Sequence, residues 1–231
     1  TSIIGPNGAG KTTVFNCLTG FYKATSGSMF LNKDNKTLDL KKFSDFKIAQ
    51  KAGVARTFQN IRLFPQMSVL ENMMVAQHNK LMVASGFSLL GLINAPSFLK
   101  KEKEAKEISK YWLDIINLTN RADDNAGDLP YGDQRKLEIV RAMCIEPHLL
   151  CLDEPAAGLN AKESAELNKL LKFIQKDKKT GILLIEHDMS VVMGISDHVV
   201  VLNYGKKIFE GTAQETKTSP EVIEAYLGTE E

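Results

Sequence analysis

The sequence lacks a dominant charge and a cysteine framework. Its 231 residues carry 29 lysines and arginines against 28 aspartates and glutamates, a net charge of +1. Because nucleic-acid binders usually carry a strong basic field, this balance argues against a nucleic-acid partner. The three cysteines are an odd number and lie in apolar or helical stretches, which favours reduced buried thiols over disulfides or a zinc site. They are Cys17, Cys144 and Cys151.

A long apolar segment is also missing. The most apolar irregular stretch, GFSLLGLI at residues 86–93, is far shorter than the roughly 20 residues that a membrane span requires. With 43% hydrophobic and 25% charged residues, the composition is that of a globular protein with one large domain, or a core with an inserted lobe. We expect a chain that does not itself cross a bilayer and that works in a cytosolic setting.

The motif GPNGAGKT at residues 5–12 fits the pattern G-x-x-x-x-G-K-[ST]. Its glycines let backbone N–H groups turn toward a phosphate, Lys11 supplies a positive charge, and the Thr12 hydroxyl can complete a Mg²⁺ shell. The residues that follow predict a helix whose N-terminus faces the same anion. The alternative is a simple glycine-rich turn, but a chain of this length would match the whole pattern by chance in only about one case in a hundred. The predicted nucleotide contacts are Gly5, Pro6, Asn7, Gly8, Ala9, Gly10, Lys11, Thr12 and Thr13.

Two carboxylates follow an apolar run in HLLCLDEP at residues 148–155. Residues 149–152 read as a buried parallel strand that delivers both carboxylates to the sheet edge where ligands of open α/β folds collect. Asp153 is predicted to hold Mg²⁺, directly or through water, and Glu154 to orient or deprotonate the water that attacks a γ-phosphate. The alternative, a surface Asp-Glu pair, is weakened by the phosphate motif.

A second apolar strand, GILLIE at residues 181–186, ends before His187. It should pair with the strand that leads to Asp153, which would bring His187 near the γ-phosphate; the alternative is a purely structural histidine. A GTPase would need an N-K-x-D segment, and residues 32–35 read NKDN, with Asp34 one place too early. Guanine specificity is therefore unsupported, and a turn between strands is predicted there.

Taken in order, GPNGAGKT, RTFQN, YGDQRKLEIVRA, LLCLDEP and LLIEHD resemble the ATP-binding subunit of an ATP-binding-cassette (ABC) transporter. The resemblance covers essentially the whole chain. It implies an α/β fold: a P-loop NTPase (RecA-like) core with an inserted α-helical subdomain, and ATP and Mg²⁺ as ligands. Only residues 2–4 precede the phosphate motif as strand, so we expect N-terminal strands, and with them the family's adenine-stacking aromatic, to be missing.

LPYGD at residues 129–133 resembles the family signature, which lies at a helix start and faces the nucleotide of a partner subunit. Pro130 replaces the usual serine, which removes a hydroxyl contact to the γ-phosphate, and Tyr131 replaces a glycine. We therefore expect the Gly132 amide and the helix N-terminus to contribute more of the contact. The contacts implied by the resemblance are Pro130, Tyr131, Gly132, Asp133 and Gln134.

The helix after the signature has a predicted apolar face formed by Leu137, Val140 and Cys144. Its charged residues are expected to stay outside; they are Arg135, Lys136, Glu138 and Arg141. A structural alternative for Asp133 is that it only caps the helix.

Two further segments match the family. Gln59 resembles the Q-loop residue, which reaches Mg²⁺ and the attacking water, so the implied metal contacts are Thr12, Gln59 and Asp153. The implied catalytic residues are Glu154, His187 and Gln59. AAGLN at residues 156–160 resembles the D-loop that crosses to the partner subunit, with Asn160 in place of the usual aspartate.

The middle of the chain predicts a helical lobe. Ser68 and Glu71 form a predicted capping box, as do Thr212 and Glu215 near the C-terminus. We expect residues 67–128 to form the helical subdomain and residues 1–66 and 129–231 to form the nucleotide-binding core. Between the predicted helices of the lobe, GFSLLGLINAPSFL at residues 86–99 has no clean period; core packing and docking of membrane-embedded helices both stay open.

Within the family, the chain most resembles ATP-binding subunits of branched-chain amino-acid importers. This implies a peripheral ATPase on the cytoplasmic face of the inner membrane. Its implied partners are a second ATP-binding subunit, identical or not, two transmembrane permease subunits and, indirectly, a periplasmic substrate-binding protein. The alternatives are an ABC ATPase of another membrane or macromolecule-remodelling system, such as lipopolysaccharide export, and a nucleotide-regulated binding module without turnover.

Overall fold

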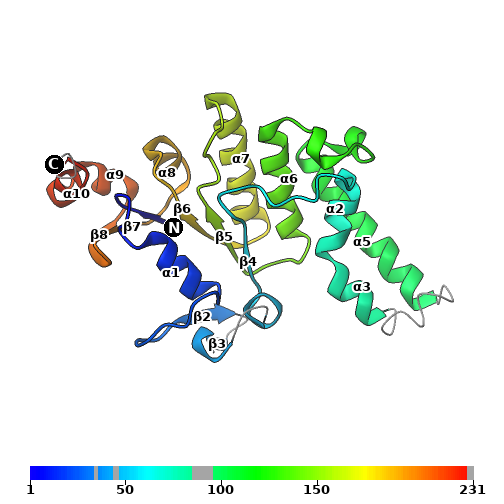
Figure 1. The fold of residues 1–231 in the computed structure, drawn as a ribbon, viewed down its shortest axis with the longest axis horizontal. Coiled ribbons are helices and arrows are strands. Elements are labelled where there is room, and N and C mark those ends of the chain that lie inside the picture. The colour runs from blue at the N-terminus through cyan, green and yellow to red at the C-terminus, as the bar shows by residue number, and fades with distance from the viewer. Residues whose placement is uncertain (34–35, 44–46, 85–95, 228–231) are drawn as a thin grey trace. The chain divides into compact units, whose positions relative to one another are not determined.

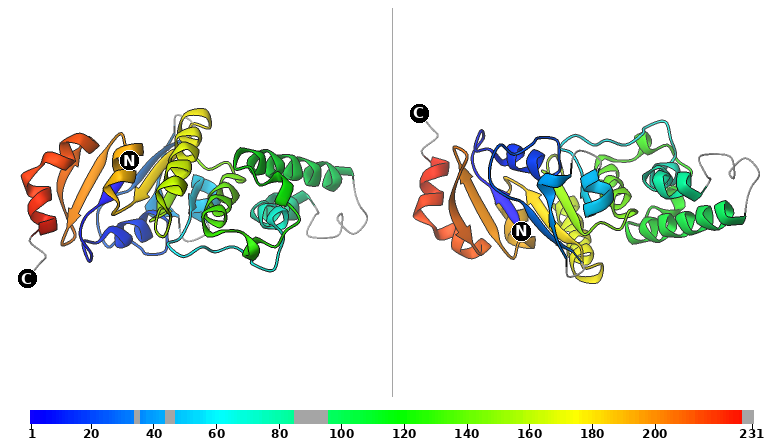
Figure 2. Two further views of the ribbon diagram at one scale, coloured as in Figure 1. Left: turned by 90° about the horizontal axis from the view of Figure 1, so that it is seen from above. Right: turned by 90° about the horizontal axis from the view of Figure 1, so that it is seen from below.

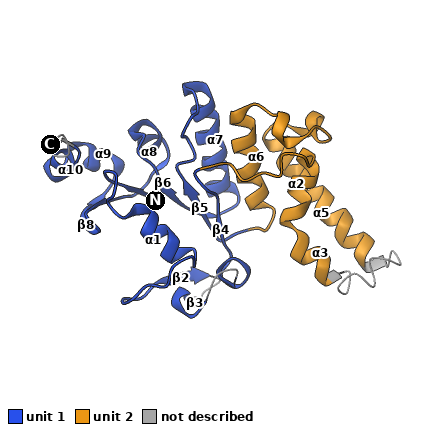
Figure 3. Ribbon diagram, in the orientation of Figure 1, with its two compact units in different colours: residues 1–59, 147–231 blue, residues 60–146 orange. Residues whose placement is uncertain are grey.

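The computed structural model describes residues 1–33, 36–43, 47–84 and 96–227, which form two compact units (Figure 1, Figure 3). Unit 1 comprises Thr1–Gln59 and Pro147–Glu231, and unit 2 comprises Asn60–Glu146. The predicted helical subdomain, residues 67–128, falls within unit 2, which also contains the helix that follows the signature segment. The predicted domain boundaries, which assign this helix to the nucleotide-binding core, stay a prediction.

Unit 1 is built on a six-stranded sheet with the order β4-β5-β6-β1-β7-β8. All neighbouring strands are parallel except β7 and β8, which form an antiparallel hairpin. The two strands predicted to lead to the carboxylates and to His187 are confirmed as neighbours, with Asp153 opposite Ile185. The strands are β1 (Ser2–Ile4), β4 (Val54–Arg56), β5 (Leu149–Asp153), β6 (Gly181–Ile185), β7 (Val199–Asn203) and β8 (Lys206–Gly211).

The central strands are apolar because helices cover them. Phe15, on the helix after β1, is fully buried and belongs to one core cluster with Cys151 of β5 and Ile185 of β6. This packing holds the N-terminus of that helix near the carboxyl ends of the strands. At the far edge of the sheet, α9 and α10 pack against β8 (Figure 2). The helices of unit 1 are α1 (Lys11–Leu18), α7 (Ala161–Asp177), α8 (Met189–Ile195), α9 (Ala213–Thr218) and α10 (Pro220–Leu227).

A small antiparallel hairpin joins α1 to the rest of unit 1. It consists of β2 (Phe30–Lys33) and β3 (Lys36–Asp39), which pair along their whole length. The prediction of two strands around NKDN is confirmed, but β2 extends into that segment and includes Asn32 and Lys33; residues 34 and 35 lie outside the described part. Two short helical turns follow, η1 (Leu40–Lys42) and η2 (Ile48–Ala52).

Unit 2 is helical, as predicted. Helices α2, α5 and α6 pack pairwise against one another, and α3 packs on α2 and α5. Ser68 caps α2 and forms the predicted capping box with Glu71; the box of Thr212 and Glu215 in unit 1 is confirmed as well. The helices of unit 2 are α2 (Val69–Ala76), α3 (His78–Ala84), α5 (Pro96–Ile115) and α6 (Tyr131–Met143), with the short turns η3 (Thr119–Arg121) and η4 (Ala126–Asp128).

The prediction for the charged face of α6 was wrong in part. Arg135 is fully buried and Glu138 is 2% exposed, although both were expected to face outward. They form an ion pair with 3.0 Å between Arg135 Nη1 and Glu138 Oε2. Each charge therefore neutralises the other, which a pattern based on single-residue hydropathy does not detect. The predicted apolar residues of this helix, including Leu137 and Val140, are buried.

Among the described helices, none combines the length and the apolar character of a membrane span. The longest, α5, has 20 residues and includes the charged run KKEKEAKE. The stretch at residues 86–95, to which most of the predicted docking segment belongs, lies outside the described residues.

Candidate active site

The phosphate motif connects β1 to α1 by a glycine-rich loop. Gly5, Gly8 and Gly10 all have positive φ, at 146°, 78° and 95°, which other residues rarely adopt. A Cβ atom on Gly5 would also stand 2.0 Å from the carbonyl oxygen of Leu202 in β7, so this position requires glycine for space as well. Helix α1 begins at Lys11, and the first N–H groups of a helix have no partner within it. The loop therefore presents its glycines and a helix N-terminus together, as a phosphate site requires.

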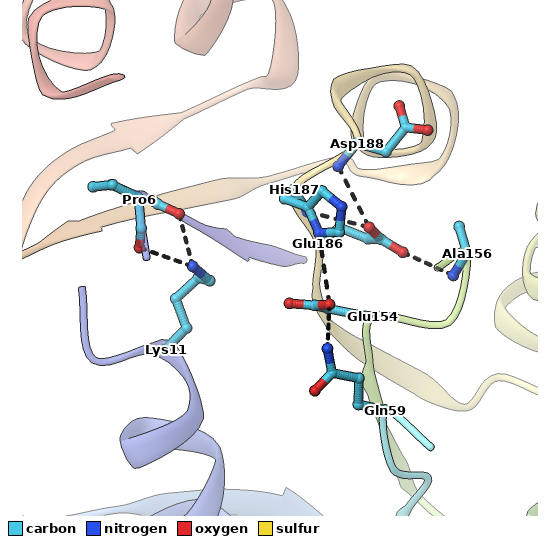
Figure 4. Close-up of polar contacts among 9 residues, drawn as sticks. Pro6, Lys11, Gln59, Glu154, Ala156, Glu186, His187 and Asp188 are labelled. Atoms are coloured by element: carbon cyan, nitrogen blue, oxygen red, sulfur yellow. Dashed lines mark hydrogen bonds and ion pairs between the residues drawn. The ribbon is translucent and has the colours of Figure 1, made fainter. Parts of the chain in front are cut away.

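Lys11 folds back over this loop (Figure 4). Its Nζ donates hydrogen bonds to the carbonyl oxygens of Gly5 at 2.7 Å and Pro6 at 3.0 Å. Burial lowers the pKa of Lys11, and the negative charges of Glu154 and Asp153 partly offset this effect. The ammonium group is thus held by the loop and feels the charge of two carboxylates, and a phosphate group would find a compact positive charge there.

The two predicted carboxylates stand at the end of β5. Asp153 is the last residue of the strand and is nearly buried, whereas Glu154 begins the following turn. Glu154 has a φ of 47°, in the left-handed region that non-glycine residues rarely occupy. Its backbone N–H donates to the carbonyl oxygen of Ile185 at 3.0 Å, so the neighbouring strand β6 holds the strained turn in place. Strain of this kind is characteristic of functional sites.

Of the three side chains predicted to act in catalysis, two converge on a carboxylate oxygen of the third (Figure 4). Gln59 Nε2 donates to Glu154 Oε2 at 2.9 Å, and His187 Nδ1 lies 3.7 Å from the same oxygen. The residues come from three separate segments, after β4, β5 and β6, which are adjacent in the sheet. Parallel neighbours end at the same edge, and this explains why residues so distant in sequence meet.

Arg56 is a residue of this site that sequence reasoning missed. Its Nη2 donates to Asp153 Oδ2 at 2.9 Å, and its Nη1 donates to Asn16 Oδ1 at 2.6 Å. The guanidinium also lies over three aromatic rings, those of Phe15, Phe21 and Phe58, at 5.1–5.4 Å from their centroids. Arg56 thereby joins the helix after the phosphate loop to the carboxylate at the end of β5.

Glu186 was also missed. Its buried carboxylate accepts hydrogen bonds from backbone N–H groups on both sides of the site, those of Ala156, His187 and Asp188. The pattern GILLIE had suggested only the end of a strand. The only sequence signal for a buried carboxylate was that Glu186 directly continues an apolar run. This signal does not identify its hydrogen-bond partner Ala156, which lies 30 residues away.

The signature segment in unit 2 forms the start of α6. Pro130 occupies the N-cap position without a side-chain cap bond, so the alternative in which Asp133 caps the helix is not what the structure has. Instead, the Asp133 carboxylate lies 2.9 Å from Lys136 Nζ. Gln134 Nε2 donates to the carbonyl oxygens of Leu129 at 2.8 Å and Gly127 at 3.3 Å. Gly132 is buried and Tyr131 is exposed.

Comparisons with known proteins decide the family. A sequence profile described as "ABC transporter" matches residues 1–157, which is well over half of the chain. The chain belongs to the ABC transporter family. A second profile, described as "Branched-chain amino acid ATP-binding cassette transporter", matches residues 206–231.

Two relatives within the ABC transporter family have the same description. BraF of Pseudomonas aeruginosa and LivG of Escherichia coli K12 are each named a "High-affinity branched-chain amino acid transport ATP-binding protein". This chain is 50% identical to each over 227 residues, covering 98% of itself and 86% of the relative. A third relative, from Methanocaldococcus jannaschii, is named "Probable branched-chain amino acid transport ATP-binding protein LivG". It is 33% identical to this chain over 233 residues, which cover 99% of this chain and 86% of the relative.

Solved structures of the ABC transporter family have the same fold. A nucleotide-free ATP-binding cassette matches with a TM-score of 0.76 and 31% identity, and the match covers 97% of this chain and 86% of the cassette. An ADP conformation of an ATP-binding cassette matches with a TM-score of 0.75 and 29% identity, covering 98% and 87%. The predicted α/β P-loop core of the ABC ATPase type is therefore confirmed.

The donors at this ABC site suit Mg²⁺ bound together with a nucleotide. Within the described residues, no group of three or more His, Cys, Asp or Glu side chains could enclose a metal ion. Mg²⁺ ordinarily keeps several waters and binds through one or two carboxylates together with substrate phosphates, so a closed protein cage is not needed. Asp153 provides such a carboxylate, and Thr12, in the first turn of α1, provides an exposed hydroxyl beside the phosphate loop.

Proposed function

We propose that this chain is the ATP-hydrolysing subunit of an ABC importer for branched-chain amino acids. The 50% identity to BraF and LivG over nearly the whole chain supports the substrate class, and the match at residues 206–231 points the same way. The observation that carries the enzymatic part is the convergence of Gln59 and His187 on the Glu154 carboxylate. The importer function is favoured over lipopolysaccharide export and over a binding module without turnover.

In the proposed reaction, Glu154 accepts a proton from the water that attacks the γ-phosphate. Its carboxylate already accepts a hydrogen bond from Gln59, which would share in orienting that water. His187 stands on the other side of the same oxygen and would donate to the γ-phosphate. The strained backbone of Glu154 holds the carboxylate at the carboxyl end of β5, so this side chain needs to reorganise little when the substrate binds.

The phosphate loop binds the nucleotide before this step. The residues 5–13 and the N-terminus of α1 hold the phosphates, and Lys11 exchanges its bonds to the Gly5 and Pro6 carbonyls for bonds to phosphate oxygens. Thr12, Gln59 and Asp153 are the residues that would hold Mg²⁺, whose charge neutralises the phosphates when it is bound. The ion pair with Arg56 engages Asp153 Oδ2 and thereby fixes the orientation of that carboxylate.

The signature segment belongs to a second site. Residues Pro130, Tyr131, Gly132, Asp133 and Gln134 would contact ATP held by a partner ATP-binding subunit, mainly through the N-terminus of α6. We further propose two transmembrane permease subunits as partners, a periplasmic binding protein as the source of the amino acid, and a position on the cytoplasmic face of the inner membrane. No nucleic-acid partner is proposed.

The test is ATP hydrolysis by the chain assembled with its membrane and ATP-binding partners, in the wild type and in Glu154→Gln. Removing a general base lowers kcat by about 100- to 10,000-fold. The Kd for ATP should stay unchanged in this variant, because the substitution retains the size of the side chain. The matched control is Glu215→Gln, which removes a carboxylate from the capping box of α9 and should not change kcat.

The amino acid is tested in the same assembly reconstituted into vesicles. Leucine, isoleucine or valine presented by the binding protein should raise the rate of ATP hydrolysis and should accumulate in the compartment that contains ATP. A wild-type assembly that binds ATP but never hydrolyses it would refute the enzymatic part. Normal hydrolysis without accumulation of any of the three amino acids would refute the substrate class alone.

A further inference from the structure

A buried carboxylate lies between the two loops that present Glu154 and His187. Glu186 directly follows β6 and is 0% exposed. Its Oε1 accepts a hydrogen bond from the backbone N–H of Ala156 at 2.9 Å. Its Oε2 accepts from the N–H groups of His187 at 3.1 Å and Asp188 at 3.4 Å. Figure 4 shows the carboxylate lying between these two segments.

The bond to Ala156 joins two strands beyond their last paired residues. The ladder between β5 and β6 ends with Asp153 opposite Ile185, and the N–H of Glu154 adds one more bond, to Ile185. Past that point the two segments of the chain separate into different loops. The carboxylate of Glu186 replaces the missing backbone acceptor for Ala156, only two residues after Glu154, so the two loops stay connected where the catalytic candidates stand.

Capping of the next helix does not account for this carboxylate. Helix α8 begins at Met189 and has its own N-cap, because Asp188 Oδ1 accepts from the N–H of Ser190 at 2.8 Å and from its hydroxyl at 2.6 Å. One oxygen of Glu186 is directed instead to the other loop. Burying a charge carries a desolvation cost, and α8 does not require this one as a cap. Burial raises the pKa of Glu186, whereas the three N–H donors favour its ionised form.

We propose that Glu186 is a positioning residue that holds the backbone after Glu154 and the backbone of His187 at a fixed separation. It does not touch the reacting atoms in this scheme. It acts by keeping Glu154 Oε2 and the His187 ring on the same side of the site, where they lie 3.7 Å apart. The inference rests on the proposed function, since it assigns a role in ATP hydrolysis. Ala156 also opens the segment 156–160 that was predicted to reach a partner subunit, so movement of that segment would be transmitted to His187.

The decisive variant is Glu186→Gln, which keeps the size of the side chain and changes one acceptor oxygen into a donor NH₂ group. A carboxylate accepts at both oxygens, whereas an amide accepts at one only. The orientation that keeps the bonds from His187 and Asp188 turns the NH₂ group against the Ala156 N–H. We therefore expect the Ala156 amide to lose its partner in this variant while the other two amides keep theirs.

Two measurements test this in the assembled transporter. Hydrogen exchange should be slow at Ala156, His187 and Asp188 in the wild type and should accelerate at Ala156 in Glu186→Gln. ATP hydrolysis should lose about 10- to 100-fold in kcat, as is usual when a group that orients a catalytic residue is removed, with KM for ATP unchanged. Glu186→Asp keeps the charge but is one methylene shorter, so it should reach only one loop and lose activity as well.

The control is again Glu215→Gln, which removes a carboxylate that accepts from the backbone N–H of Thr212 outside the site. It should change neither kcat nor exchange at Ala156. A purely structural role would lower Tm and leave the kcat of the folded enzyme intact, so kcat is measured on the folded fraction only.

Several outcomes would overturn the inference. One is a kcat for folded Glu186→Gln within about twofold of the wild type, since this change is far below the expected loss. The second outcome is measured on the wild type alone: the inference fails if the amides of Ala156 and His187 exchange hydrogen as fast as those of an unstructured peptide. If the wild-type assembly hydrolyses no ATP at all, the proposed function fails instead, and exchange at Ala156 still decides whether Glu186 joins the loops.

Discussion

The buried ion pair of α6 allows a prediction in which stability and pH are linked. Arg135 and Glu138 have side-chain exposures of 0% and 2%, and their charged atoms are 3.0 Å apart. Glu138 Oε1 also accepts the backbone N–H of Arg62 at 2.8 Å. Burial raises the pKa of Glu138, and this effect outweighs the opposing influences of the Arg62 N–H and the Arg135 charge. Burial is therefore the largest influence on the Glu138 pKa.

Replacing Arg135 by Met removes the positive partner and leaves the carboxylate buried. Breaking a buried ion pair on one side costs about 3–5 kcal/mol. For a chain of this size, each kcal/mol shifts Tm by about 2–4 °C, so we expect Tm to fall by about 6–20 °C at neutral pH. The side chain of Met fills most of the volume of the arginine stem, so the loss comes from the stranded charge more than from a cavity.

The variant should recover stability in acid. Without Arg135, two of the influences that lower the Glu138 pKa are lost, so its folded-state pKa rises further. A carboxyl group with a raised folded-state pKa destabilises the fold when it ionises. The deficit relative to the wild type therefore develops as the pH rises above the wild type's folded-state pKa of Glu138, which is itself raised, and is complete above the higher folded-state pKa of the variant. Glu138→Gln instead strands Arg135, which stays charged at every accessible pH, and it has no carboxyl group at position 138 to protonate, so its deficit should not shrink in acid.

Differential scanning calorimetry of both variants from about pH 5 to about pH 8 distinguishes these cases through the proton linkage. Lys101→Met serves as the control, because Lys101 and Glu104 form an ion pair with the same spacing on the surface of α5, and its loss should change Tm little. If the Tm deficit of Arg135→Met were the same across this range, the stranded Glu138 would not be its cause, and the reasoning would be refuted.

Two further predictions concern Arg56 and the cysteines. Arg56→Met should raise the Mg²⁺ concentration that gives half-maximal ATP hydrolysis by about 10- to 100-fold, because Asp153 loses the group that orients it; an unchanged Mg²⁺ dependence would contradict this. Burial raises the pKa of Cys144 and of Cys151 to about 12, so both thiols stay protonated at neutral pH. Mass spectrometry after brief treatment of the native chain with a thiol reagent should find the label on Cys17 alone, and label on Cys151 would show that the sheet opens.

The parts of the fold that the sequence predicted correctly have local or strongly periodic signals. The phosphate loop needs glycines at particular positions, and the strands before Asp153 and His187 are apolar runs of a length typical of buried parallel strands. Given those strands, parallel topology brings their ends together. The convergence of Gln59, Glu154 and His187 could therefore be anticipated in part, and the capping box at Ser68 could be read from two residues.

The missed features depend on pairs that lie far apart in sequence or that neutralise each other. Arg56 and Asp153 are 97 residues apart, and no local pattern connects them. The ion pair of Arg135 and Glu138 is local, but the helical period assigns each charge separately to the solvent face. In both cases the interior accepts a charge because a specific partner is present, which depends on tertiary structure.

The left-handed backbone of Glu154 has a consequence for any effort to make this protein more robust. Asparagine and glycine adopt this conformation more readily than glutamate, so either residue would relieve strain worth about 1 kcal/mol. Both would also remove the carboxylate on which Gln59 and His187 converge. A library selected only for survival at high temperature should therefore become enriched in chains that fold well, bind nucleotide and no longer turn it over.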